Sequence, residues 1–312
     1  MQVKVSSGDY KGLKTVTVEN EAVSISIVPQ LGSKIVSLKL KTVNTEYVFQ
    51  KVSPLNLEPY DGNYTQGEMC GFDDMFPTID TGYYDRFPWK GVLMPDHGEV
   101  WPLTWTTELS HDSAVFSVHG IRFPYRLSKK ISVEDNSVLV QYKVQNKTSY
   151  DMDYLWCGHF MLAAETGSKF DIYDNDTEMI TTYSKSGSIG SYGDSFRFPF
   201  VTLPDGSEYD VSILRDSSYQ DFQKFYFKHP LRTGRIALLH PNGRKIEVSF
   251  DPTKTPFAAL LQSENGDYNV QCAFIEPCTA PFDSPLAARL RNLQSVLKGD
   301  STTEWYIKFT LS

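Results

Sequence analysis

The sequence contains few of the residues that typify exported, disulfide-linked or membrane-spanning proteins. Only four cysteines occur in 312 residues, and none forms a CxxC pair, so a disulfide scaffold is excluded and reduced thiols are expected. No apolar run approaches the roughly 20 residues that span a bilayer, and no apolar signal-peptide core follows Met1. We therefore expect a cytoplasmic protein without a membrane partner.

Positive charge and ligand-binding motifs are also scarce. Lysine and arginine total 30 against 38 acidic residues, which gives a net charge of -8. Nucleic-acid binders present a basic face, whereas the one densely basic stretch, 122–130, is interpreted as a solvated strand face. The sequence has no HExxH motif, no closely spaced histidine pair, no P-loop and no GxGxxG. We expect no nucleic-acid partner, no metal and no cofactor.

Helical periodicity is rare, and alternation with a period of two dominates. One helix is predicted over 284–297, where Ser284 can cap the first turn and leucines recur at helical spacing. Alternation of apolar and polar residues predicts half-buried strands at 14–19, 22–28, 35–40, 137–144, 235–239, 245–250, 258–262 and 305–311. Without repeats or a long linker, we predict one domain over 1–312, an all-β antiparallel sandwich with few short helices.

Aromatic residues are abundant, with 19 Phe, 18 Tyr and 5 Trp. Many fall in predicted strands, which favour aromatic side chains. Others crowd into a long stretch at 60–98 that is rich in Gly, Pro and Asp. Long loops inside a compact domain are commonly functional, so this segment is predicted to supply the apolar walls of a ligand pocket.

Five ionisable residues stand out by their surroundings. His159 interrupts the apolar run LWCGHFML, and Glu276 ends the apolar run AFIEP at a predicted strand mouth. His97 lies in PDHGEVW beside two carboxylates and a tryptophan. The pair Asp73-Asp74 would point to opposite faces of a strand, so at most one would face a ligand. Each can serve acid–base chemistry, or be a buried structural histidine or a rim carboxylate.

Several segments in order resemble the aldose 1-epimerases, or galactose mutarotases. The resemblance is strongest at 139–148 followed by 156–160, and further blocks lie at 71–79, 96–99, 275–281 and 297–300. It implies a large galactose mutarotase-like β-sandwich, the supersandwich, and interconversion of the α and β anomers of a hexose without a cofactor. Glu276 would be the general base, His159 the general acid, and His97 a group on the ring-oxygen side.

The same resemblance suggests which residues contact the sugar, and it has gaps. The expected substrate-binding residues are Phe72, Asp74, Arg86, Trp89, Asp96, Glu99 and Trp156. The family's Asn-Arg pair before the first histidine is missing, and Arg86 is the only arginine between Tyr60 and His97. The family's later sugar-binding Asp has no clear counterpart, although Asp221 and Lys224 lie in that region. The chain therefore looks like a divergent branch.

Three other functions fit the same residues. A non-catalytic carbohydrate-binding protein would need the aromatic residues but not both His159 and Glu276. A glycoside hydrolase would use two carboxylates, for which Asp74 and Glu276 are candidates. A sugar-phosphate epimerase would need basic residues near the site.

Overall fold

The alternating segments form two large antiparallel sheets in the computed structural model, which describes residues 2–174, 177–203 and 205–312. The larger sheet has 12 strands. Its order is β1 (Lys4–Tyr10), β2 (Leu13–Glu19), β3 (Val23–Val28), β4 (Lys34–Leu40), β6 (Phe72–Met75), β14 (Cys157–Ala163), β24 (Gln271–Cys278), β23 (Phe257–Glu264), β20 (Asp221–Phe227), β16 (Glu178–Ser184) and β17 (Ser195–Arg197), with β5 (Thr45–Glu46) beside β4.

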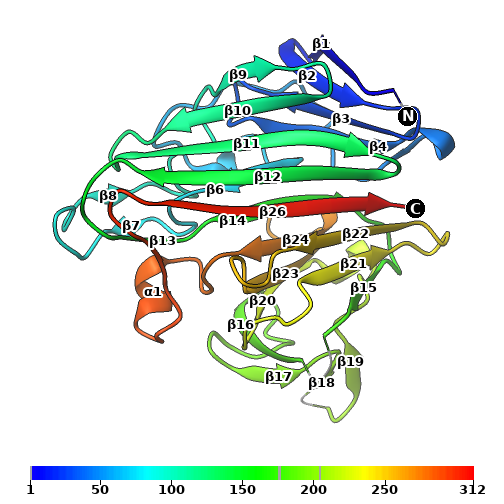
Figure 1. Cartoon of the computed structure of the whole chain (residues 1–312). Coiled ribbons are helices and arrows are strands. Elements are labelled where there is room, and N and C mark those ends of the chain that lie inside the picture. Colours follow the sequence, from blue (N-terminus) through cyan, green and yellow to red (C-terminus); the bar gives the residue numbers. More distant parts are fainter. Residues whose placement is uncertain (1, 175–176, 204) are drawn as a thin grey trace.

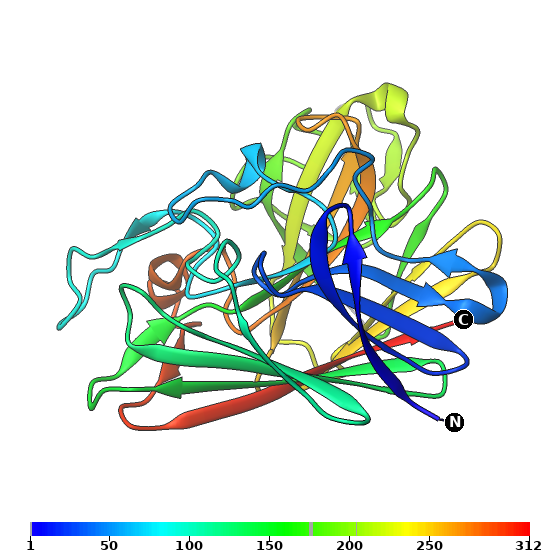
Figure 2. The ribbon, with the colours of Figure 1, turned by 90° about the horizontal axis from the view of Figure 1, so that it is seen from above.

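The smaller sheet has eight strands and lies across the first (Figure 1). Its order is β15 (Lys169–Ile172), β21 (Arg235–Leu239), β22 (Lys245–Phe250), β26 (Thr302–Leu311), β12 (Ser137–Asn146), β11 (Tyr125–Glu134), β10 (Ser113–His119) and β9 (Thr106–Leu109). Three two-stranded ribbons complete the described strands: β13 (Met152–Tyr154) with β25 (Ser295–Leu297), β18 (Phe200–Thr202) with β19 (Glu208–Asp210), and β7 (Gly82–Tyr83) with β8 (Leu93–Met94). Both termini lie at the same end of the molecule (Figure 2).

The main core lies between the two sheets. Phe309 of β26 approaches Phe72 of β6 and Phe160 of β14, with ring centroids 5.9 and 4.9 Å apart. On β12 and β11 the buried positions mostly alternate with more exposed ones, because one face packs inward and the other meets solvent. The predicted all-β sandwich of large antiparallel sheets is confirmed.

The predicted helix over 284–297 is wrong beyond its first turns. The helix α1 (Pro285–Arg289) is five residues long, and Asn292 has a left-handed backbone with φ of 59°, which interrupts a right-handed helix. Leu290 is 71% exposed, so the leucine spacing does not mark a buried helical stripe. The end of the predicted segment instead forms β25, which pairs with β13.

The remaining helical turns are short 3-10 segments, η1 (Lys41–Val43), η2 (Tyr64–Gln66) and η3 (Ser217–Tyr219). Of these, η2 matters for the site described below, because it lies within the long segment 60–98 predicted to form a pocket wall. Among the described residues, no helix is long and apolar enough to cross a membrane.

Candidate active site

His159 and Glu276 meet on one face of the larger sheet. Their strands, β14 and β24, are antiparallel neighbours in which Cys157 pairs with Cys278 and Phe160 with Ile275. This register sets His159 opposite Glu276, and side chains opposite each other on paired strands share a face. The Nε2 atom of His159 lies 3.2 Å from Oε1 of Glu276, and both side chains are buried.

Lys224 holds the other oxygen of Glu276. It lies on β20, a strand buried along its whole length, and its Nζ atom is 3.1 Å from Oε2 of Glu276. The same ammonium donates a 2.7 Å hydrogen bond to Oδ1 of Asp283. Oδ1 of Asp283 also accepts a hydrogen bond from the hydroxyl of Tyr226. One buried cation therefore serves two carboxylates.

Tyr64 approaches His159 from the side of the imidazole that faces away from Glu276. Its segment, η2, is fixed because the side chain of Asn63 accepts hydrogen bonds from the backbone of Thr65 and Gln66. The Tyr64 hydroxyl lies 3.2 Å from Nδ1 of His159 and donates a 2.8 Å hydrogen bond to Oδ2 of Asp73. Both nitrogens of the imidazole therefore have polar neighbours.

His97 stands beside this group on a strained turn. Its φ is 57°, in the left-handed region that few non-glycine residues adopt. Its ring stacks on Tyr64 with centroids 4.2 Å apart, and its Nδ1 atom lies 2.9 Å from Oδ1 of Asp96. The other oxygen of Asp96 accepts the backbone N–H of Tyr64. Asp96 thus fixes the positions of two cavity residues relative to each other.

Burial disfavours a charged imidazole on His159 together with a charged carboxylate on Glu276. Burial, followed by the charges of His97 and Lys224, lowers the pKa of His159 well below its ordinary value. Burial raises the pKa of Glu276, although the ammonium of Lys224 opposes this shift. A neutral imidazole and a carboxyl group that retains its proton are both favoured, so a proton between Nε2 and Oε1 suits the pair.

A cavity of about 130 Å³ opens beside these groups. It is lined by Tyr64, Thr65, Met69, Ile79, Asp80, His97, His159, Phe222, Lys224, Leu261, Tyr268, Phe274 and Asp283. Burial, together with the nearby carboxylate of Asp283, raises the pKa of Asp80 to about 6. Apolar walls with a few polar groups suit a small amphipathic ligand such as a sugar. No group of three or more His, Cys, Asp or Glu in the described ranges could hold a metal ion.

Three predicted residues lie in the layer between the sheets and not at the cavity. Successive residues of β6 alternate in direction: Asp73 faces Tyr64, whereas Asp74 pairs with Lys129, 2.8 Å away, and accepts the indole N–H of Trp156. Phe72 packs against Phe160 in the main core. Asp74, predicted to contact the sugar, therefore does not line the cavity, and Asp73 is connected to it only through Tyr64.

The other predicted sugar contacts also lie outside the cavity lining. Glu99 is buried, and it accepts a 2.7 Å hydrogen bond from the hydroxyl of Tyr60 and another from the backbone N–H of Arg122. Trp89 packs near Tyr84 and Phe123. Arg86 pairs with Asp153. Asp96 touches the site only through His97 and Tyr64.

Sequence reasoning missed Tyr64, Asp80 and Asp283. Of the two residues placed in the region of the family's later acidic group, Lys224 enters the site, whereas Asp221 pairs with Arg215 elsewhere. The strand DFQKFYF is buried on both faces, so no alternation pointed to Lys224. Asp283 follows Phe282 in a turn where both residues have positive φ. No local sequence motif predicts this turn.

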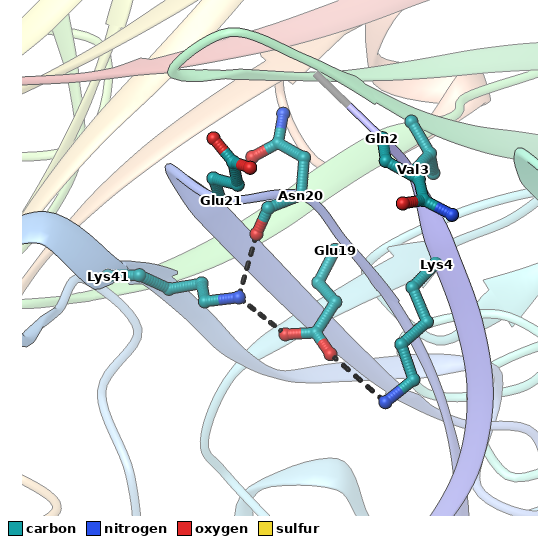
Figure 3. Close-up of a pocket in the computed structure, with 7 residues that line it drawn as sticks. All are labelled: Gln2, Val3, Lys4, Glu19, Asn20, Glu21 and Lys41. Atoms are coloured by element: carbon teal, nitrogen blue, oxygen red, sulfur yellow. Dashed lines mark hydrogen bonds and ion pairs between the residues drawn. The ribbon is translucent and has the colours of Figure 1, made fainter.

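A larger hollow of about 340 Å³ lies at the N-terminal edge of the larger sheet (Figure 3). Glu19 stands between Lys41, 2.8 Å away, and Lys4, 4.0 Å away. Lys41 also donates to the backbone carbonyl of Asn20. This hollow contains paired surface charges and none of the acid–base residues, so the smaller cavity is the candidate active site.

No protein-family model matches the chain, and no curated protein matches it either. Solved structures do match the chain. A galactose mutarotase-like protein from Clostridium acetobutylicum superposes with a TM-score of 0.70 at 14% identity, covering 100% of this chain and 99% of that one. A galactose mutarotase related enzyme from Lactobacillus acidophilus gives 0.66 at 16% identity, covering 96% and 97%. A galactose mutarotase-like protein from Lactobacillus casei gives 0.64 at 17% identity, covering 96% and 100%.

These similarities span nearly the full length of each chain, although few residues are identical. They agree with the fold implied by the ordered sequence blocks, and the low identities agree with the divergence indicated by the missing motifs. The chain has the galactose mutarotase-like fold.

Proposed function

We propose that this protein is an isomerase of the aldose 1-epimerase type, which interconverts the α and β anomers of a hexose. The observation that supports it is the 3.2 Å approach of His159 and Glu276 beside a cavity. The oxygen of the anomeric hydroxyl and the ring oxygen of a pyranose are both bonded to C1. A base for one and an acid for the other must therefore lie within a few ångströms of each other.

The proposed reaction opens and closes the sugar ring. Glu276 removes the proton of the C1 hydroxyl while Nε2–H of His159 protonates the ring oxygen, and the bond between C1 and that oxygen breaks. The open-chain aldehyde rotates about the C1–C2 bond. His159 then removes the proton from the ring-derived hydroxyl as it attacks C1, and Glu276 returns a proton to the new C1 hydroxyl. Before ring opening the shared proton lies on Nε2, and the ammonium of Lys224 supports the carboxylate form of Glu276 that this requires. After ring opening the proton lies on Glu276 and the imidazole is neutral, which is the state that burial favours.

Lys224 and His97 have supporting roles in this proposal. The ammonium of Lys224 stabilises the carboxylate form of Glu276. His97 is held by Asp96 and lines the cavity, where it would hydrogen-bond the sugar. A cytoplasmic location and the absence of a nucleic-acid partner remain predictions of the sequence.

The substrate in this proposal carries no phosphate. In the described lining of the cavity the one lysine is Lys224, there is no arginine, and the ammonium of Lys224 is already bound to Glu276 and Asp283. Asp80 and Asp283 add negative charge. The glycoside hydrolase alternative is weakened because Asp74 lies on the far face of β6.

The direct test is the rate at which freshly dissolved α-hexoses reach anomeric equilibrium, followed by polarimetry or by NMR exchange. A panel of hexoses and pentoses should reveal at least one whose equilibration the protein accelerates. If no sugar in the panel equilibrates faster than in buffer, the proposal fails. Analysis of a glycoside incubated with the protein would detect hydrolysis instead.

A further inference from the structure

We infer that Lys34, Asp73 and Tyr64 form a relay that fixes a proton on Nδ1 of His159 and so directs Nε2 to Glu276. The relay makes Tyr64 and Asp73 positioning residues for the proposed epimerase reaction, and the kinetic part of the argument rests on that function. The position of the proton on His159 is independent of that function, because it follows from hydrogen-bond donors and acceptors alone.

The relay begins at a buried lysine whose donors are all used. The side chain of Lys34 is 1% exposed. Its ammonium donates to the backbone carbonyls of Glu68 and Cys70, at 2.9 and 3.0 Å, and to Oδ2 of Asp73. An ammonium group has three hydrogens and no acceptor. Lys34 therefore donates its third hydrogen to Asp73, and its positive charge is paired with that carboxylate.

Asp73 in turn sets the direction of the tyrosine hydroxyl. Burial raises the pKa of Asp73, and the ammonium of Lys34 opposes this shift. Because Lys34 donates a hydrogen bond directly to Oδ2 of Asp73, we take the ionised carboxylate, which can only accept hydrogen bonds. The hydroxyl of Tyr64, 2.8 Å from Oδ2 of Asp73, must therefore donate its one hydrogen there. The phenolic oxygen keeps its lone pairs for its other neighbour, Nδ1 of His159 at 3.2 Å.

The proton on His159 follows from this count. Nδ1 faces an oxygen that has no hydrogen left to give, so Nδ1 must carry a hydrogen and donate it to Tyr64. In a neutral imidazole the lone pair then lies on Nε2, 3.2 Å from Oε1 of Glu276. That contact is attractive only when a proton lies on Nε2 or on the carboxyl group. The relay thus favours the single transferable proton that acid–base exchange requires.

The direct experiment is NMR of the full chain labelled with ¹⁵N-histidine, with His159 assigned by comparison with His159→Gln. We expect Nδ1 of His159 to show the shift and one-bond coupling of a protonated nitrogen at neutral pH, whether or not Nε2 is also protonated. A bare Nδ1 with a protonated Nε2 in the unmodified protein would overturn the relay. This measurement needs no substrate.

The kinetic experiment uses Tyr64→Phe, which keeps the ring that stacks on His97 and removes only the hydroxyl. We expect kcat for anomer equilibration to fall about 10- to 100-fold, by analogy with the loss seen when the orienting partner of a metal-bound histidine is removed, with a smaller change in KM. The Nδ1 signal of His159 should shift in the same variant. Tyr47→Phe is the matched control, since Tyr47 is also buried and donates one hydrogen bond, to the backbone carbonyl of Ser312.

The outcomes separate the relay from the proposed function. A protonated Nδ1 in a protein that accelerates no sugar would support the relay and reject the epimerase activity. An active protein in which Tyr64→Phe leaves both kcat and the Nδ1 signal unchanged would reject the relay and keep the activity. If Tyr64→Phe fails to fold, the NMR measurement on the unmodified protein still decides.

Discussion

Nζ of Lys224 lies 3.1 Å from Oε2 of Glu276 and 2.7 Å from Oδ1 of Asp283. A single ammonium thus compensates two carboxylates, one of which is fully buried. Charges removed from water are tolerated only when they are paired. The pairing therefore bears on the stability of the protein as well as on the chemistry proposed for Glu276.

Replacing Lys224 by methionine should destabilise the fold. The variant keeps much of the aliphatic volume but leaves Glu276 and Asp283 without their cation, a loss that typically costs about 3–5 kcal/mol. Urea denaturation followed by circular dichroism measures the free energy of unfolding. Lys228→Met is the control, since Lys228 pairs with Glu178 at the surface and should change stability by less than about 1 kcal/mol. Equal effects of the two substitutions would contradict the prediction.

Replacing Glu276 by glutamine should abolish most of the acceleration of anomer equilibration. The amide has a similar shape but cannot remove a proton, and loss of a general base typically lowers the rate by about 10²- to 10⁴-fold. Polarimetry gives the rate and circular dichroism checks the fold. Glu264→Gln alters another buried carboxylate, one that pairs with Arg215, and should retain activity. Full activity in Glu276→Gln would remove Glu276 from the mechanism.

Asp80 should make the protein less stable as the pH rises from about 4 to about 6. Its pKa is raised from 3.8 to about 6 in the folded protein, so the folded state binds more protons than the unfolded state in that window, and stability falls with rising pH. Asp80→Asn should therefore have a higher Tm than the unmodified protein at pH 7, and the difference should vanish near pH 3.5. Thermal unfolding at both pH values checks this, and an equal difference at both would show that the carboxyl group does not titrate as described.

Gly98→Ala should disturb the turn that presents His97. Gly98 has φ of 81°, and a Cβ atom there would lie 2.3 Å from the backbone oxygen of Phe76. We expect a loss of stability greater than about 1 kcal/mol and slower anomer equilibration. Gly91→Ala is the control, because Gly91 has a similar φ of 87° but open space around it. Denaturation of both variants separates the steric clash from the cost of positive φ, and a Gly98→Ala loss no larger than that of Gly91→Ala would contradict the clash.

A phosphorylated sugar should be a poorer substrate than the free sugar. A phosphate in the cavity would meet Asp80 and Asp283, while the ammonium of Lys224 is already paired. We expect kcat/KM for a hexose 6-phosphate to be at least about 10-fold lower than for the hexose, which corresponds to about 1.4 kcal/mol of transition-state binding. NMR exchange on both compounds measures the ratio. A higher kcat/KM for the phosphate would favour a sugar-phosphate epimerase.

The strands were predictable where one face of the sheet meets solvent. The segments 235–239 and 245–250 coincide with β21 and β22, and 137–144 lies within β12. Alternation failed to identify β20 as a source of site residues, because both of its faces are buried. The helix over 284–297 was overextended because leucine spacing says nothing about whether a partner surface is present to bury the stripe.

The candidate site was predictable in part. His159 and Glu276 could be singled out from the sequence because burying an ionisable group in an apolar strand costs free energy, which indicates a functional or structural role. Their contact depends on the pairing of β14 with β24, which no local pattern encodes. The alternation rule separated Asp73 from Asp74 but could not say which face holds the cavity. Tyr64 was hidden because its position depends on how η2 folds over the sheet.

The pairing of β14 with β24 has a consequence for how this protein can be altered. The proposed acid–base pair, His159 and Glu276, stands on these two paired strands, whereas Tyr64, Asp80, His97 and Asp283 come from connecting segments. Connecting segments tolerate insertion and exchange, while a one-residue slip in a strand turns its side chains to the other face. Changes in these connecting segments can therefore alter the lining of the cavity while the strand register still holds His159 opposite Glu276.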